Sequence, residues 1–277
     1  MYICEKVYDK DFVKWFKSWR NHQKTNIMAF LEKNKIYLGD CLEIMKDIQD
    51  KSVDCVICDL PYQITSNSWD TIIPFDKLWE LYDRVCKDNA MICLFASQPF
   101  SSALVMSNLK MFRHEWIWIK NRGSNFANTV REPMKEHEHI LCFSKGKWTY
   151  NKQMQARSGG GLERVQYNVK FDTSSSNYRE FDIREENKLS DLRVPSSWQK
   201  FNTEVGLHPT QKTVLLIEYL IKTYTNDGEL VLDNCMGSGT TAIACINTHR
   251  DFIGMEKEEK YFNIANERIA DRQQCLF

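Results

Sequence analysis

No apolar run in this sequence approaches the roughly 18–20 residues that a helix needs to cross a bilayer. The opening residues, MYICEKVYDKDF, lack the apolar core of a secretory signal peptide. The formal net charge is zero, so the composition as a whole gives no sign of a nucleic-acid partner. Internal repeats and long low-complexity tracts are also missing. These absences predict a cytoplasmic globular protein that forms one domain over residues 1–277, with no membrane partner.

Cysteine is abundant, but its pattern predicts neither disulfides nor a metal site. The ten cysteines are scattered along a chain that is long enough to fold without the support of disulfides, which favours reduced thiols. Cys55 and Cys58 have the C-x-x-C spacing of zinc sites, yet they lie in an apolar run typical of a strand, where residues three apart face opposite ways. His137 and His139 share a strand face and lack a metal-binding partner. We therefore expect no metal.

Seven short apolar runs predict buried β-strands, with helical patterns between some of them. The runs cover residues 35–40, 53–60, 90–97, 114–120, 139–145, 229–234 and 251–256. In the helical pattern over 212–224, Leu216, Leu220 and Ile221 share one face, and Thr210 or Thr213 is available as the N-cap. This alternation predicts an α/β fold with a mostly parallel sheet covered on both faces. The consecutive runs at 114–120 and 139–145 predict an antiparallel edge.

Two segments depart from this alternation. Residues 151–205 have little periodicity and many turn formers, which is typical of a functional insertion on an α/β core. The amphipathic segment within residues 1–33, which contains Trp15, Phe16 and Trp19, predicts a helical extension packed on the core.

Charge is distributed unevenly along the chain. Residues 110–170 contain twelve Lys or Arg against five Glu, whereas residues 226–277 contain nine acids and five bases. A protein with one DNA-facing side shows such polarity, but a solvated face explains it equally well.

A glycine-rich turn, CMGSGTTAIACI, follows the strand predicted at 229–234. Gly237, Gly239 and Ala242 satisfy the G-x-G-x-x-A pattern, which binds nucleotide cofactors when it joins a strand to a helix. Glu256 lies nineteen residues after Gly237 at the end of the next strand, where a Rossmann-like fold places a carboxylate for a ribose diol. The P-loop pattern G-x-x-x-x-G-K-[ST] is not matched. The turn therefore indicates an adenosine-type cofactor, either NAD or S-adenosylmethionine.

The stretch CDLPYQITSNSWD places a carboxylate, a proline and an aromatic ring at the end of another predicted strand. Asp59 and a backbone carbonyl there can accept both hydrogens of a delocalised exocyclic amine, so that its nitrogen lone pair aims at a methyl group. Pro61 holds Leu60 extended, and Tyr62 offers a face for stacking. A core tyrosine after a proline turn is the plain structural alternative. A dehydrogenase has no use for this tetrapeptide, which favours S-adenosylmethionine.

These motifs together resemble those of the amino-methylating DNA methyltransferases of the circularly permuted β group. Asp59-Leu60-Pro61-Tyr62 resembles their catalytic D-P-P-Y motif, and LDNCMGSGTTAIA resembles their cofactor motif D-P-F-x-G-S-G-T-T. HPTQKTVLLIEYLI, YLGDC and HEHILCFSKG resemble three further landmarks, and spacing and order agree over about residues 36–270. The resemblance implies a Rossmann-like class I S-adenosylmethionine-dependent methyltransferase sheet, circularly permuted, with a target-recognition insertion at about 147–205.

The resemblance also implies roles for single residues. Asp59, Leu60, Pro61 and Tyr62 would be catalytic. The residues implied to bind S-adenosylmethionine are Asp40, Cys41, Asp59, His208, Thr210, Lys212, Asp233, Gly237, Ser238, Gly239, Thr240, Thr241 and Glu256. In that set, Glu256 would bind the ribose, Asp40 would approach the adenine amine, and Lys212 would pair with the cofactor carboxylate. The partner would be DNA with its target base flipped out of the duplex; family members are often homodimers, but this sequence has no interface signature.

Three departures accompany the resemblance. Leu60 replaces the first proline, Gln63 stands where glycine is common, and Asn234-Cys235 replaces Pro-Phe, which puts an aromatic contact near the cofactor in question. An initial Asp rather than Ser favours adenine. The predicted function is therefore site-specific adenine-N6 methylation of DNA by a bacterial or phage enzyme. The alternatives left open are a cytosine-N4, RNA or protein-amide methyltransferase, a catalytically silent DNA-binding module and, more distantly, a nicotinamide oxidoreductase.

Overall fold

The structure is a computed structural model that describes residues 30–63, 71–157, 191–204, 206–207 and 210–275. Most of the predicted N-terminal extension, the middle of the predicted insertion (158–190) and His208 lie outside these ranges.

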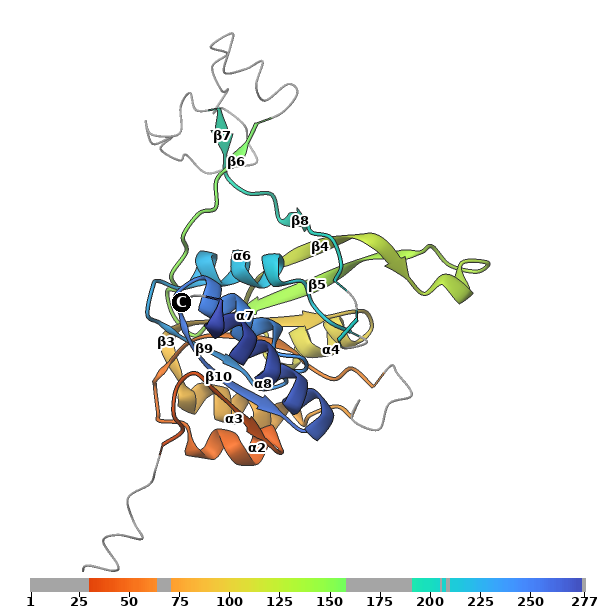
Figure 1. The fold of residues 1–277 in the computed structure, drawn as a ribbon. Helices are drawn as coiled ribbons and strands as arrows, with labels where there is room; N and C mark the ends of the chain where they lie inside the picture. Colours follow the sequence, from red (N-terminus) through yellow and green to blue (C-terminus); the bar gives the residue numbers. More distant parts are fainter. Residues whose placement is uncertain (1–29, 64–70, 158–190, 205, 208–209, 276–277) are drawn as a thin grey trace, which may run out of the picture.

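An eight-stranded sheet forms the centre of the described part of the molecule, in the order β1-β10-β9-β2-β3-β5-β4-β8 (Figure 1). Its strands are β1 (Lys35–Leu38), β2 (Val53–Asp59), β3 (Cys86–Ala96), β4 (Phe112–Ser124), β5 (Lys135–Phe143), β8 (Trp198–Lys200), β9 (Leu230–Asp233) and β10 (Asp251–Glu256). The strands from β1 to β3 in that order are parallel, whereas β5 is antiparallel to both β3 and β4. All seven predicted strands are present, and the predicted antiparallel edge is confirmed.

The parallel strands are apolar on both faces because helices cover both sides of the sheet. In β2, every residue from Val53 to Cys58 is buried. Cys55 packs into the core on one face and Cys58 into the core on the other, so both are core residues, as the strand period predicts. The nine cysteines within the described ranges are all free thiols.

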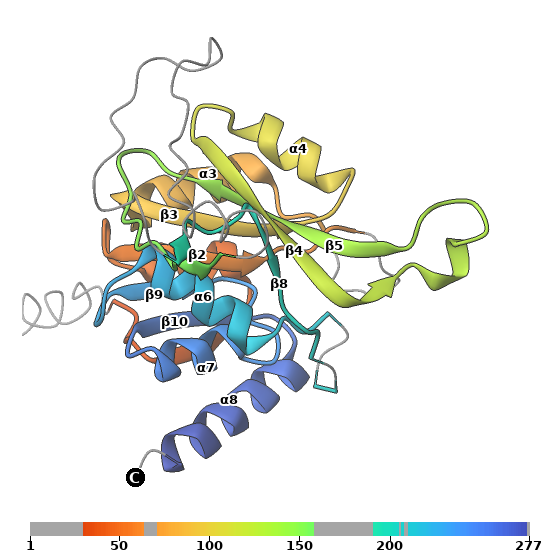
Figure 2. The same ribbon diagram turned by 90° about the horizontal axis from the view of Figure 1, so that it is seen from above.

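Helices lie in two layers, one on each face of the sheet (Figure 2). The Cys55 face packs against α6 (Val214–Tyr224), α7 (Thr240–Asn247) and α8 (Glu259–Gln274). The Cys58 face packs against α2 (Cys41–Ile44), α3 (Phe75–Val85) and α4 (Phe100–Ser107), with the 3₁₀ turn η2 (Met45–Asp47) after α2. No helix in the part of the chain that the structure describes is long and apolar enough to span a membrane.

The N-terminus of α6 is capped by a residue from the segment that precedes the helix, not by its own N-cap side chain. Thr213 occupies the N-cap position, as one of the two predicted candidates, but its side chain makes no capping bond. Glu204 Oε1 instead accepts hydrogen bonds from the Val214 N–H (3.1 Å) and the Thr213 hydroxyl (2.9 Å). A carboxylate at this position also interacts favourably with the helix dipole. The end of the predicted insertion is thereby held against the start of α6.

The described parts of the predicted insertion contain more regular structure than the sequence pattern indicates. β6 (Gln155–Ala156) and β7 (Leu192–Arg193) pair antiparallel in a stem that stands away from the main sheet (Figure 1). β8 extends the main sheet by pairing parallel with β4, so the prediction of an irregular segment was wrong there. Trp198 is half exposed and Gln199 is buried, the reverse of an apolar strand pattern. β8 forms a strand because it can pair with the edge of β4, and no local sequence pattern indicates such a partner.

Candidate active site

A cavity of about 1100 Å³ opens at the carboxyl ends of the parallel strands. This edge of an open α/β sheet is the usual place for ligands. The cavity collects nearly all of the predicted site residues within the described ranges: Asp40, Cys41, Asp59, Leu60, Pro61, Tyr62, Thr210, Lys212, Asp233, Gly237, Ser238, Thr240, Thr241 and Glu256. Gly239, between the lining residues Ser238 and Thr240, does not itself line the cavity, and His208 is outside the described residues.

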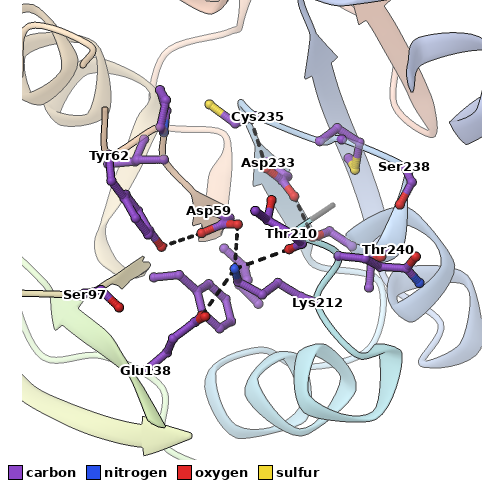
Figure 3. Close-up of a pocket in the computed structure, with 18 of the residues that line it drawn as sticks. Asp59, Tyr62, Ser97, Glu138, Thr210, Lys212, Asp233, Cys235, Ser238 and Thr240 are labelled. Carbon is purple, nitrogen blue, oxygen red and sulfur yellow. Dashed lines mark hydrogen bonds and ion pairs between the residues drawn. The ribbon is translucent and has the colours of Figure 1, made fainter. Parts of the chain in front are cut away.

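Asp59, the last residue of β2, is held by two donors in the cavity (Figure 3). Lys212 Nζ lies 2.6 Å from Asp59 Oδ2, and the Tyr62 hydroxyl donates to Oδ1 at 2.5 Å. Burial raises the pKa of the Asp59 carboxyl, and the Lys212 ammonium opposes this rise. Each carboxylate oxygen has a fixed donor and keeps further acceptor capacity for a substrate.

Lys212 is a buried cation between two carboxylates. Its side chain is 9% exposed, and Nζ contacts Glu138 Oε2 at 3.3 Å in addition to Asp59. The same ammonium lies 5.1 Å from the centroid of the Phe95 ring. Burial lowers the pKa of Lys212, but the two carboxylates raise it by more, so the side chain stays charged. Its observed partners are therefore Asp59 and Glu138, and pairing with a cofactor carboxylate stays a prediction.

A further ion pair continues this row of charges into the antiparallel edge of the sheet. Glu138 on β5 binds Lys120 on β4 through Oε1. Burial raises the pKa of Glu138, yet Lys212 and Lys120 together lower it by more, so its net pKa is below the ordinary value. Neither Lys120 nor Glu138 was predicted as a site residue. In the sequence, Lys120 and Glu138 each stand at one end of an apolar strand run. That pattern alone does not show that the two side chains pair, because the pairing of β4 with β5 is seen only in the structure.

The glycine-rich turn between β9 and α7 adopts backbone conformations that glycine permits. The φ angle is +55° at Gly237 and +84° at Gly239, both in the left-handed region. A Cβ on Gly239 would also lie 3.0 Å from the Cβ of Ala265 on α8. Gly239 is the N-cap of α7, and Thr240 and Thr241 open that helix, as predicted. Gly239 thus shapes the turn and lets α8 pack closely behind it.

Asp233, the last residue of β9, is a buried carboxylate beside this turn. Its Oδ2 accepts a hydrogen bond from the Thr241 hydroxyl at 2.6 Å, and its Oδ1 accepts one from the Cys235 N–H at 3.1 Å. Burial raises the pKa of Asp233 to about 7, although both hydrogen bonds oppose the rise. This carboxyl group therefore titrates near neutrality at the wall of the cavity.

Two more carboxylates border the cavity at neighbouring strand ends. Glu256 ends β10, and its side chain accepts hydrogen bonds from the Gly237 N–H (2.7 Å) and the Glu258 N–H (2.8 Å). Asp40 follows β1 and caps α2 by accepting from the Leu42 N–H at 2.8 Å. These bonds orient both carboxylates and leave acceptor capacity for hydroxyl or amine groups. Together with the glycine-rich turn, they suit an adenosine-containing cofactor.

The three departures from the expected motifs have structural counterparts. Gln63 has a φ of +58°, the left-handed conformation that glycine adopts most easily. Leu60 is buried in the core on the α2–α4 face. Asn234 Oδ1 accepts from the buried Tyr82 hydroxyl at 2.6 Å, and Cys235 lines the cavity where the family motif has an aromatic ring.

The histidine pair has ordinary surroundings. The rings of His137 and His139 are 5.5 Å apart, and His139 Nδ1 is 2.9 Å from Glu115 Oε2. Within the described ranges, no group of three or more His, Cys, Asp or Glu side chains is arranged to hold a metal ion.

Comparison with known sequences matches this chain to DNA methyltransferases. A family model described as DNA methylase (N6_N4_Mtase) matches residues 53–267. The type II methyltransferase M1.MboII of Moraxella bovis is 30% identical to this chain over 255 residues, covering 85% of this chain and 96% of the relative. The type II methyltransferase M.HpaI of Haemophilus parainfluenzae is 26% identical over 251 residues, covering 85% and 74%.

Solved structures agree with the sequence comparison. The M1.HpyAVI–SAM complex is 28% identical, with a TM-score of 0.58 over 84% of this chain and 98% of that one. The PvuII DNA methyltransferase (cytosine-N4-specific) has a TM-score of 0.61 over 89% of this chain and 93% of that one. At 13% identity, the PvuII comparison shows a shared fold only.

Proposed function

Since this chain belongs to the DNA methylase family and is a DNA methyltransferase of type II, we propose that it methylates the exocyclic N6 amine of adenine within a specific DNA sequence. The observation that carries the proposal is the Asp59 carboxylate, fixed by Lys212 and Tyr62 in the same cavity as the glycine-rich turn and Glu256. The choice of adenine rests on the aspartate at the first position of the catalytic tetrapeptide, residues 59–62.

The cofactor is S-adenosylmethionine, which supplies an electrophilic methyl group when it is bound. Glu256 has acceptor capacity for the two ribose hydroxyls, and Asp40 has it for the adenine amine. The turn Gly237–Gly239 would line the methionine part, with Asp233 beside it. The pKa of about 7 at Asp233 lets its carboxylate form when a cationic amine group approaches.

The catalytic tetrapeptide would hold the target amine by its hydrogens. Asp59 would accept one N–H, and the Leu60 carbonyl would accept the other, which turns the nitrogen lone pair toward the methyl group. Positive charge develops on that nitrogen, and the fixed Asp59 carboxylate stabilises it. Lys212 and Tyr62 keep the carboxylate oriented before the substrate arrives. The Tyr62 ring, which lines the cavity 4.9 Å from the Phe100 ring, would stack on the flipped base.

The order of the elements supports the circularly permuted β arrangement. β2, with the catalytic tetrapeptide at its end, comes far earlier in the chain than β9, although the two strands are neighbours in the sheet. The segment at about 147–205 would recognise the target sequence, since its described end reaches the cavity at Thr203 and Glu204. A homodimer in the cytoplasm of a bacterium or a phage-infected cell completes the proposal.

The test is methylation of unmethylated plasmid DNA with S-adenosylmethionine, followed by digestion to nucleosides and mass spectrometry. N6-methyldeoxyadenosine is expected, and sequencing of the product then gives the site. N4-methyldeoxycytidine would overturn the choice of adenine. If no methylated base is found although cofactor binding is measurable, the substrate would be RNA or protein, or the enzyme would act only in a complex with a further subunit.

Asp59→Asn is the matched inactive variant, since the amide keeps the shape of the carboxylate and removes its charge. We expect the methylation rate to fall by about 10²–10³-fold or more, because a fixed charge that faces the transition state is lost. Cofactor affinity, measured by calorimetry, should change little. Loss of cofactor binding with the rate at saturation intact would contradict the role given to Asp59.

A further inference from the structure

The antiparallel strands β4 and β5 continue beyond the body of the protein as a two-stranded arm, residues 121–136 (Figure 2). Pairing persists out to Ser124 and Lys135, and the turn between them includes the 3₁₀ turn η3 (Phe126–Asn128). Two apolar side chains at its tip are largely exposed to solvent, Phe126 (78%) and Val130 (90%), whereas Met134 nearby is only 39% exposed. A single exposed apolar residue is ordinary, but two on one projecting tip indicate a contact surface.

Hydrogen bonds fix the conformation of the tip of the arm, although the tip is exposed. Asn125 has a φ of +72°, and its Nδ2 donates to Glu132 Oε1 at 2.9 Å. The Thr129 hydroxyl donates to the Phe126 carbonyl at 2.9 Å, and the Arg131 N–H donates to the Asn128 carbonyl at 2.9 Å. The side chains of Phe126 and Val130 are therefore presented by an organised turn.

The arm also borders the active-site cavity. Residues at its base and tip line that cavity: Lys120, Arg122, Gly123, Ser124, Asn125, Asn128 and Lys135. Arg122, Arg131 and Lys135 are exposed, and within the described part of the chain none of the three takes part in an ion pair. The arm thus joins apolar tips and unpaired positive charge at the mouth of the site where the target base would enter.

We propose that this arm enters the DNA beside the target base pair, where Phe126 and Val130 fill the space that the flipped adenine leaves. Arg122, Arg131 and Lys135 would contact the flanking phosphates. Apolar side chains that enter the base stack stabilise an opened duplex by replacing lost stacking contacts. This proposal rests on the DNA methyltransferase function proposed above, and it assigns DNA opening to a segment separate from the target-recognition segment at about 147–205.

The experiment compares single-turnover methylation of two duplexes that carry the methylated sequence found with plasmid DNA. One duplex is fully paired, and the other has an abasic site opposite the target adenine, so that flipping breaks no base pair. The variant is Phe126→Ser with Val130→Ser. Leu109→Ser is the control, because Leu109 is 57% exposed and precedes the opposite end of β4.

We expect the double variant to lose at least about tenfold in rate on the paired duplex and to regain most of it on the abasic duplex, because the preopened site no longer needs stabilisation. The control should match the wild type on both. Equal losses on the two duplexes, or no loss, would overturn the proposal. A change from dimer to monomer in sedimentation would overturn it as well, since the tip would then be an interface between copies. If the wild type methylates no DNA in the plasmid test, the proposed function itself fails first.

Discussion

At the scale of the single residue, Lys212 determines the charge state of the active site. Lys212→Met leaves Asp59 and Glu138 buried without their shared cation, and breaking a buried ion pair in this way costs about 3–5 kcal/mol. We expect the pKa of Asp59 to rise, so that the acidic limb of the pH–rate profile moves to higher pH. The measurement is the single-turnover rate at a series of pH values.

The matched control for this change is Lys212→Arg, which keeps the positive charge and should keep much of the profile. An unchanged profile in Lys212→Met, together with a large loss of cofactor affinity, would contradict the pairing with Asp59. It would support the cofactor carboxylate as the partner of Lys212.

Asp233 makes stability depend on pH in a direction opposite to that of most carboxylates. Its pKa is about 7 in the folded protein, and the unfolded value is about 3.9, so the folded state binds an extra proton between these values. The contribution of Asp233 to stability is therefore full below about pH 4 and is lost as pH rises toward 7. In Asp233→Asn, which cannot ionise, urea unfolding should show a flatter pH dependence over this window. The same slope in both proteins would mean that Asp233 is already ionised when folded.

At the scale of the element, the glycine-rich turn is constrained both by its backbone and by α8. Gly239→Ala places a side chain at φ +84° and 3.0 Å from the Ala265 Cβ. Gly228→Ala is the matched control, because Gly228 has a φ of +78° with nothing within 4 Å of its added Cβ. The control should lose about 1–2 kcal/mol of unfolding free energy from the backbone alone. Gly239→Ala should lose more, as measured by urea unfolding, and equal losses would show that α8 adjusts freely.

Elements formed by local patterns were predictable, and elements formed by distant partners were not. The strands of the parallel core appear in the sequence as apolar runs, since both of their faces are buried. β8 is a strand through its pairing with β4, and the α6 cap comes from Glu204. The tetrapeptide at residues 59–62 was readable because all four residues are adjacent in sequence. The partner of Asp59, Lys212, lies 153 residues away, and Glu138 joins them only through the antiparallel pairing of β5.

At the scale of the whole molecule, cofactor binding should stabilise the entire domain. The carboxylates expected to hold S-adenosylmethionine lie at the ends of β9 and β10 and just after β1. The bound cofactor would therefore contact residues from three strands of the sheet at once. A ligand at a hundred times its Kd adds about 2.7 kcal/mol to the free energy of unfolding. We expect a clear rise in Tm with S-adenosylmethionine, retained in Asp59→Asn. An equal rise with NAD would contradict the cofactor assignment and favour the oxidoreductase alternative.

The order of strands in the sheet has a consequence for synthesis on the ribosome. β1 is not paired with β2, its successor in the chain; it is paired with β10, and β9 and β10 separate the two. During translation, β1 has no strand to pair with until β9 and β10 have been made, and β10 begins more than two hundred residues after β1 ends. The cofactor wall is built from those same late strands, whereas Asp59 is made early. A ribosome-bound chain that stops short of β9 therefore has the catalytic carboxylate and nowhere to hold a methyl donor, so the growing polypeptide stays inactive until its sheet closes.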